Sequence, residues 1–301
     1  MNNAILKKVY GIWPRFFIMK NIQLLAFLLP MALMVAACTT ANEPTSDIVA
    51  PSPLQIMFAS DDYYVGTPRI TLVMFDGAKP ATGLQDVTVT LYDISEETPQ
   101  EVWSGEATEY ADAPVPYWTI FPEIPTAGDW GLAIDAITAE GTPDNYQRSI
   151  PVADAPRSPA VGTVPPASVN RTIETHDVAV LSSGNDPNPD LYDQTVADAL
   201  QSGKPSVITF ATPAFCATQV CAPVVDTVES VYAEIGEAAN FIHLEIYDDF
   251  QELTTAAEVA EWGLTSEPWT FVLNAEGEVA ARMGGPVSVA EIMEALEPLL
   301  P

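Results

Sequence analysis

The chain has 301 residues, and its 41 aspartates and glutamates outnumber its 11 lysines and arginines, which gives a net charge of −30. Such an acidic chain repels phosphate groups, so nucleic acids and anionic lipid head groups are poor partners. At about 100 to 200 residues per domain, the length suggests two domains.

The first 37 residues contain no acidic residue, carry four cations and end in an apolar run over residues 24–37. This pattern predicts a signal peptide for export. The run closes on Val35-Ala36-Ala37-Cys38, which resembles a bacterial lipobox. We therefore expect a lipoprotein signal peptide over residues 1–37, lipidation of Cys38, and a polar tether over residues 38–52.

A start at Met19 instead of Met1 would give a signal peptide of usual length. The alternative is an uncleaved membrane anchor, although the apolar run is shorter than the ~20 residues that a span needs. Both alternatives place the rest of the chain outside the cytoplasm and attach it to the cell membrane, on the periplasmic side or at the cell surface. Residues 38–301 hold all 41 acidic residues and seven cations, a net charge of −34.

Residues 53–151 contain short β-rich runs separated by clusters of Gly, Pro and Asp. Seven such runs occur, at 54–58, 70–75, 87–92, 101–104, 117–121, 130–137 and 146–150. This spacing predicts an all-β sandwich, which loosely resembles the immunoglobulin-like domains of bacterial surface proteins. We expect Trp103, Trp118 and Trp130 in its core, and we find no catalytic motif in this region. The favoured role is a spacer or a partner-binding module.

Residues 152–171 are rich in proline, alanine, serine and valine, which predicts a semi-rigid linker and a domain boundary. After it, strands and helices alternate over residues 172–301. Strands are expected at 178–181, 206–210, 241–247, 270–273 and 279–283, and helices at 194–201, 223–236, 251–262 and 289–300. The last two strands flank a hairpin turn at Asn274-Ala275-Glu276-Gly277. The pattern predicts an α/β domain with a mixed sheet.

Cys216 and Cys221 lie between the strand at 206–210 and the helix that follows. On one continuous helix their Cα atoms would be roughly 8 to 9 Å apart, whereas a disulfide requires less than about 7 Å. Either Cys216 lies in a loop that folds back toward Cys221, or the two do not pair. Pro223 favours a helix start there, where free amides would stabilise a Cys221 thiolate. With Lys204 the nearest cation in sequence, we expect only a modestly activated thiol.

Several separated segments of residues 172–301 resemble the thioredoxin family. They are Gly203-Lys204-Pro205, the cysteines at the strand-to-helix junction, Pro223, residues 262–273, and the glycines at 277, 284 and 285. The resemblance implies a thioredoxin-like fold in which Pro268 is the cis proline that faces the redox cysteines. In thiol-disulfide exchange, we expect Cys216, which lies in the loop, to attack a partner disulfide and Cys221 to resolve the intermediate. Phe215, Pro268 and Trp269 would form an apolar rim that binds a peptide substrate.

The chain departs from the family pattern in two places. The family's C-x-x-C is here C-x4-C, and Thr209 stands where thioredoxins often hold a buried acid. Sco-type copper proteins carry C-x3-C and a distal histidine, but His243 lies within an expected strand, where a hydrogen-bonded structural histidine is the simpler interpretation.

Three interpretations of the whole chain remain open. The favoured one is a membrane-anchored, extracytoplasmic thiol-disulfide oxidoreductase of the cell envelope that acts on exported proteins through Cys216 and Cys221 and uses no cofactor. The second is a non-catalytic surface-binding lipoprotein with a structural disulfide, which would not be an enzyme. The third is Sco-like copper delivery.

Overall fold

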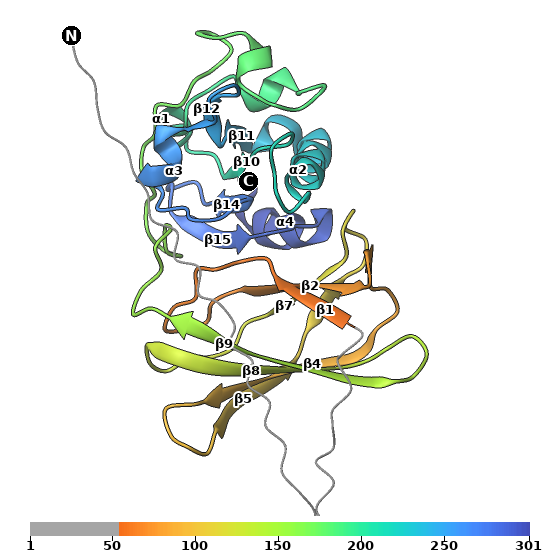
Figure 1. Ribbon diagram of the computed structural model, residues 1–301. Coiled ribbons are helices and arrows are strands. Elements are labelled where there is room, and N and C mark those ends of the chain that lie inside the picture. Colours follow the sequence, from red (N-terminus) through yellow and green to blue (C-terminus); the bar gives the residue numbers. More distant parts are fainter. Residues whose placement is uncertain (1–53) are drawn as a thin grey trace, which may run out of the picture. The chain divides into compact units, whose positions relative to one another are not determined.

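The computed structural model describes residues 54–301, which belong to one compact unit (Figure 1). The predicted signal peptide, the tether and the lipidation site at Cys38 lie outside the described residues. Within residues 54–301, none of the helices has the length and hydropathy needed to cross a membrane.

The first nine strands form two antiparallel sheets. One sheet has the order β1-β2-β7-β6, with β3 paired to β2, and the other has the order β5-β4-β8-β9. Their bounds are β1 Leu54–Phe58, β2 Ile70–Asp76, β3 Lys79–Pro80, β4 Gln85–Asp93, β5 Gln100–Glu106, β6 Thr108–Tyr110, β7 Tyr117–Ile120, β8 Gly128–Ile137 and β9 Pro143–Val152. All seven expected runs are strands. The sequence analysis missed β3 and β6, which are too short to show an alternating pattern.

One apolar core is shared by the two sheets. Leu72 of β2 and Leu91 of β4 are both fully buried in it, so side chains from the inner faces of both sheets contribute. Trp118 and Trp130 belong to this core, as expected, whereas Trp103 is only partly buried and packs against it. Two sheets that enclose one core are the arrangement of a β-sandwich. The resemblance of this sandwich to immunoglobulin-like domains stays a prediction.

The segment between β9 and β10 contains the 3₁₀ helices η1 Val178–Val180 and η2 Pro189–Leu191 and the short helix α1 Val196–Ala199. The prediction of a strand at 178–181 is wrong. The Asp177 side chain accepts a hydrogen bond from the Ala179 amide and caps a helical turn there.

Residues of the predicted linker pair with a later strand. The Gly162 amide donates to the Val279 carbonyl at 2.8 Å, and the Val279 amide donates to the Thr163 carbonyl at 2.9 Å. The linker and the domain boundaries predicted from it stay predictions.

Four of the later strands form the expected mixed sheet, with the order β11-β10-β14-β15, and β12 and β13 form a separate two-stranded sheet. β10 pairs parallel to β11 and antiparallel to β14, and β14 pairs antiparallel to β15. The strands are β10 Ser206–Ala211, β11 Asn240–Glu245, β14 Trp269–Leu273 and β15 Val279–Gly284; the other elements are α2 Cys221–Ile235, η3 Gly236–Ala238, β12 Tyr247–Asp249, β13 Thr254–Thr255, α3 Ala257–Glu261, α4 Val289–Leu296 and η4 Glu297–Leu299. The helix expected at 251–262 is therefore shorter than predicted, because Thr254–Thr255 pair with β12.

Helices cover both faces of this mixed sheet. Val207 of β10 packs with residues of α2 and α4, whereas its neighbour Ile208 packs in a second cluster with Val196 of α1 and Trp262. Figure 1 shows α2 and α4 on one side of the strands and α1 and α3 on the other. Since successive residues of β10 point to opposite faces and both faces are covered, all six residues of the strand are buried.

Candidate functional site

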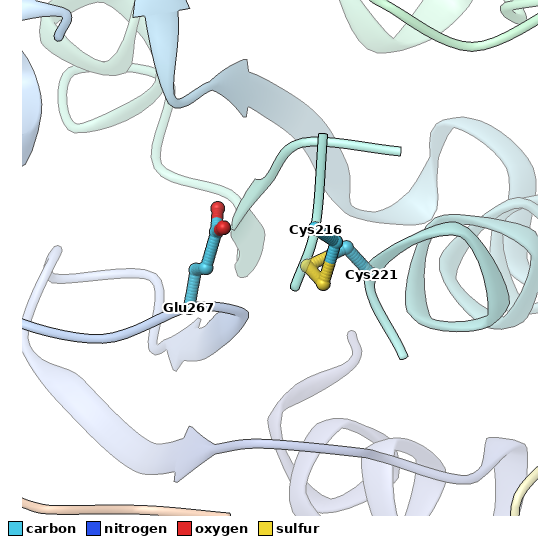
Figure 2. A group of neighbouring side chains, drawn as sticks. All are labelled: Cys216, Cys221 and Glu267. Atoms are coloured by element: carbon cyan, nitrogen blue, oxygen red, sulfur yellow. A yellow bond between two sulfur atoms is a disulfide. The ribbon is translucent and has the colours of Figure 1, made fainter. Parts of the chain in front are cut away.

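Cys216 and Cys221 form a disulfide whose Cα atoms are 5.9 Å apart (Figure 2). Cys216 lies in the loop after β10, and Cys221 is the first residue of α2. The Gln219 amide donates to the Cys216 carbonyl at 3.3 Å, and Gln219 has a left-handed φ of 60°. The four intervening residues thus form a turn, which confirms the alternative in which the loop folds back toward the helix.

The two sulfur-bearing residues differ in exposure. Cys221 is fully buried and packs with Ala211 and Val225, whereas Cys216 is only partly buried. The Thr218 hydroxyl donates a hydrogen bond to Cys216 Sγ at 3.2 Å. The helix starts two residues before Pro223, so Cys221 lies within its first turn. An external thiol can therefore approach Cys216 but not Cys221.

Pro268 lies at the same edge of the sheet as the cysteines. The pairing of β10 with β14 places Phe210 opposite Trp269, so the residues before Trp269 meet the loop that follows β10. The peptide bond between Glu267 and Pro268 is cis, as the resemblance to thioredoxins implied. Antiparallel pairing of these two strands thus brings the proline segment and the disulfide together.

Glu267 completes this group, and the sequence analysis did not identify it. Its carboxylate and the two sulfur atoms lie within 4.8 Å of one another, and Figure 2 shows its side chain beside the disulfide. The oxygen Oε2 is buried and has no hydrogen-bond partner among the described residues. Burial, followed by the negative charge of Glu245, raises the pKa of Glu267 to about 7. The sequence feature that could have pointed to Glu267 is its position directly before Pro268, which matches the cis proline of thioredoxins.

The neighbouring polar residues of β11 have partners. His243 Nε2 lies 3.0 Å from the Ala211 carbonyl, which can only accept, so Nε2 carries the proton and Nδ1 accepts from the Tyr192 hydroxyl at 2.6 Å. Burial lowers the pKa of His243, which favours this neutral form. Glu245 accepts from the amides of Ser183 and Ile246 at 2.8 and 2.9 Å. His243 is thus the hydrogen-bonded strand histidine that the sequence suggested.

The predicted apolar rim is only partly exposed. Phe215 is 39% exposed, but Pro268 is buried, and Trp269 is 4% exposed and stacks on Phe271 with ring centroids 5.6 Å apart. Phe215 instead packs against two aromatic rings that the sequence analysis missed, those of Tyr247 and Phe250, at centroid distances of 6.1 and 5.8 Å. Substrate binding by Phe215, Pro268 and Trp269 stays a prediction.

No protein-family model and no curated protein sequence matches the chain. Solved structures similar to parts of it include a thioredoxin-family thiol:disulfide interchange protein from Chlorobium tepidum, with 17% identity, coverage of 50% of this chain and 100% of that one, and a TM-score of 0.32. A DsbF homologue from Corynebacterium diphtheriae matches with 17% identity, coverage of 35% and 76%, and a TM-score of 0.31. StoA from Bacillus subtilis matches with 18% identity, coverage of 46% and 98%, and a TM-score of 0.28. Because these TM-scores are low, the proposals below rest on the geometry of the chain itself.

Proposed function

We propose that the chain is a thiol-disulfide oxidoreductase whose redox pair is Cys216 and Cys221. The observation that carries the proposal is the disulfide between a partly exposed loop cysteine and a buried cysteine at a helix start. A purely structural bridge would not require one of its cysteines to be partly exposed. The free amides of the first turn of α2 would stabilise a Cys221 thiolate as it forms or leaves.

The exchange runs in two balanced steps. In the reduced chain, the Cys216 thiolate attacks one sulfur of a partner disulfide, forms a mixed disulfide and releases the first partner thiolate. Cys221 then loses its proton and attacks Cys216 Sγ, which forms the intramolecular disulfide and releases the second partner thiolate. The partner disulfide gains two electrons and the chain's dithiol loses them. Run in reverse, the same steps oxidise a partner dithiol.

The proposal includes a cellular location and a class of substrate. The export signal and the lipobox-like sequence before Cys38 support a lipid-anchored protein outside the cytoplasm, where a close cysteine pair can oxidise. Its substrates would then be thiols and disulfides of exported proteins. Phe215 directly precedes Cys216 and packs with the rings of Tyr247 and Phe250, and this aromatic cluster suits apolar segments of incompletely folded chains.

A second candidate function follows from the cluster of three donor groups. Once the disulfide is reduced, two thiolates and the Glu267 carboxylate would lie close enough to share one metal ion. Thiolates select soft metals such as Cu(I), so the cluster favours copper delivery as the alternative. The complete burial of Cys221 favours a third candidate, a binding protein with a structural disulfide.

The reduction potential of the Cys216–Cys221 pair tests the proposal. Thiol labelling across a dithiothreitol or glutathione series should give a potential above about −250 mV, in the range of working oxidoreductases. A value below about −300 mV, or labelling only after unfolding, would favour the structural disulfide. Cu(I) titration of the reduced chain, with Cys216→Ser as the control, separates the copper alternative from both.

A further inference from the structure

Thioredoxins often hold a buried acid on the central strand, but the matching residue here is Thr209, which is fully buried and lies against Thr270 with 3.4 Å between the hydroxyl oxygens. The resolving cysteine Cys221 is also fully buried. When the Cys221 thiol becomes a nucleophile, its proton therefore needs an acceptor inside the protein. Within residues 54–301, the carboxylate placed with both sulfur atoms is that of Glu267.

We propose that Glu267 is the proton carrier of the redox pair: its carboxylate accepts the Cys221 proton during resolution and returns it in the reverse reaction. The inference rests on the proposed oxidoreductase function. Glu267, in the loop before β14, would accept the proton that Thr209 on β10 cannot accept, because Thr209 has no carboxylate.

The geometry supports this task in two ways. The carboxylate and sulfur atoms lie within 4.8 Å of one another, a distance that one water molecule or a rotation of the Glu267 side chain bridges. The oxygen Oε2 is buried and has no partner among the described residues, so it is available to accept a proton. A buried polar atom without a partner costs free energy, and it lies here at the point where the reaction moves a proton.

The surroundings of Glu267 tune its acidity for this step. Burial and the charge of Glu245 on β11 together favour the protonated carboxyl and raise the pKa of Glu267 to about 7. The loop itself is held by Asp61, which accepts hydrogen bonds from the hydroxyls of Thr265 and Ser266 at 2.9 and 2.8 Å. A carboxyl with a pKa near neutrality can both accept and donate a proton under working conditions.

The proton transfer completes the resolution step. The Cys221 S–H bond breaks, its proton passes to a Glu267 oxygen, and the sulfur electron pair forms the bond to Cys216 Sγ. The bond between Cys216 and the partner sulfur breaks, and the partner leaves as a thiolate. In the opposite direction, the departing Cys221 thiolate takes the proton from the Glu267 carboxyl.

The two steps can be timed separately with 5,5′-dithiobis(2-nitrobenzoate). Attack by Cys216 releases a first thionitrobenzoate anion, and resolution by Cys221 releases a second. This anion leaves without being protonated, so the second rate reports the removal of the proton from Cys221. Stopped-flow absorbance of the reduced full-length chain, in a Cys38→Ser background, records both releases from this cysteine pair alone.

We expect Glu267→Gln to slow the second release at pH 7 by about 10-fold or more, because general-base catalysis contributes factors of this size and above. The first release should stay within about two-fold, since Cys216 attacks before Cys221 reacts. As a matched control, Glu276→Gln changes an exposed glutamate in the turn between β14 and β15 and should leave both releases unaltered.

The pH profile distinguishes proton transfer from an indirect structural effect. In the unsubstituted chain, the second release should rise with an inflection near pH 7. Glu267→Asp should keep an inflection, whereas Glu267→Gln should lose it. A second release that is equally fast in Glu267→Gln, or an equal slowing of both releases, would overturn the inference and leave the oxidoreductase proposal intact. Failure of the unsubstituted chain to react until it unfolds would overturn both.

Discussion

Two glutamates in different regions of the molecule have opposite surroundings. Glu291 of α4 is 5% exposed and binds Arg69, with Nε and Oε1 2.7 Å apart and Nη2 and Oε2 2.8 Å apart. The Tyr117 hydroxyl donates to the same carboxylate. Glu267 lies beside the disulfide, and its Oε2 has no partner among the described residues.

The presence or absence of a charged partner distinguishes a carboxylate that stabilises the fold from one that is suited to proton transfer. The buried guanidinium of Arg69 pairs with the Glu291 carboxylate, and Arg69 also donates to the carbonyls of Gly284 and Pro286 at 2.7 and 2.9 Å. Glu267 lacks such compensation, so its pKa rises to about 7. An uncompensated carboxyl with a perturbed pKa is typical of a functional site, and it occurs here next to the Cys216–Cys221 disulfide.

The largest expected effect comes from removing the partner of Glu291. Arg69→Met would leave a buried, uncompensated carboxylate like that of Glu267, and it should lower the free energy of unfolding by about 3 to 5 kcal/mol. Urea unfolding at pH 7 measures the loss. The double variant Arg69→Met, Glu291→Gln removes the charge as well and should recover part of it. A loss below about 1 kcal/mol in the single variant would contradict the comparison.

A smaller effect should follow from the ionisation of Glu267 with pH. Its folded-state pKa of about 7 lies above the ordinary value of 4.5, so the folded state favours the protonated form. This contribution to stability is fully present below pH 4.5 and is lost as pH rises through 7. Because the side chain is partly exposed, we expect a loss of only about 1 to 2 kcal/mol.

The measurement compares urea unfolding of the unsubstituted chain and of Glu267→Gln at pH 5 and pH 8. The stability of the variant relative to the unsubstituted chain should rise between these pH values, because the amide cannot ionise. An unchanged difference would show that Glu267 has the same pKa in the folded and unfolded chain.

The smallest effect is expected at a carboxylate near the surface. Asp248 pairs with Arg171 at 3.0 Å between Oδ1 and Nη2, and their side chains are 44% and 26% exposed. Asp248→Asn should change the free energy of unfolding by less than about 1 kcal/mol, because water and salt already screen the pair. The same urea experiment at low and high salt checks this. A loss as large as that of Arg69→Met would show that burial does not decide how much each of these carboxylates contributes to the free energy of unfolding.

Local patterns in the sequence were enough to locate most elements. The seven β-rich runs of residues 53–151 and the strands over 206–210, 270–273 and 279–283 are all present, because alternation, apolar runs and turn residues act over a few neighbours. The same reasoning failed at residues 178–181, where a cap at Asp177 competes with the strand, and it made the helix over 251–262 too long. The cysteine spacing allowed two geometries, and the turn at Gln219 decided between them.

The sequence by itself predicted an export signal and a redox role for Cys216 and Cys221, and it matched Pro268 to a cis proline. Only the tertiary structure brought Glu267 to the disulfide, because that contact depends on β14 pairing with β10. The contact between Arg69 and Glu291 spans 222 residues and leaves no local trace in the sequence. Local patterns report which residues form a strand or helix, whereas the partners of a buried carboxylate depend on packing between segments far apart in the chain.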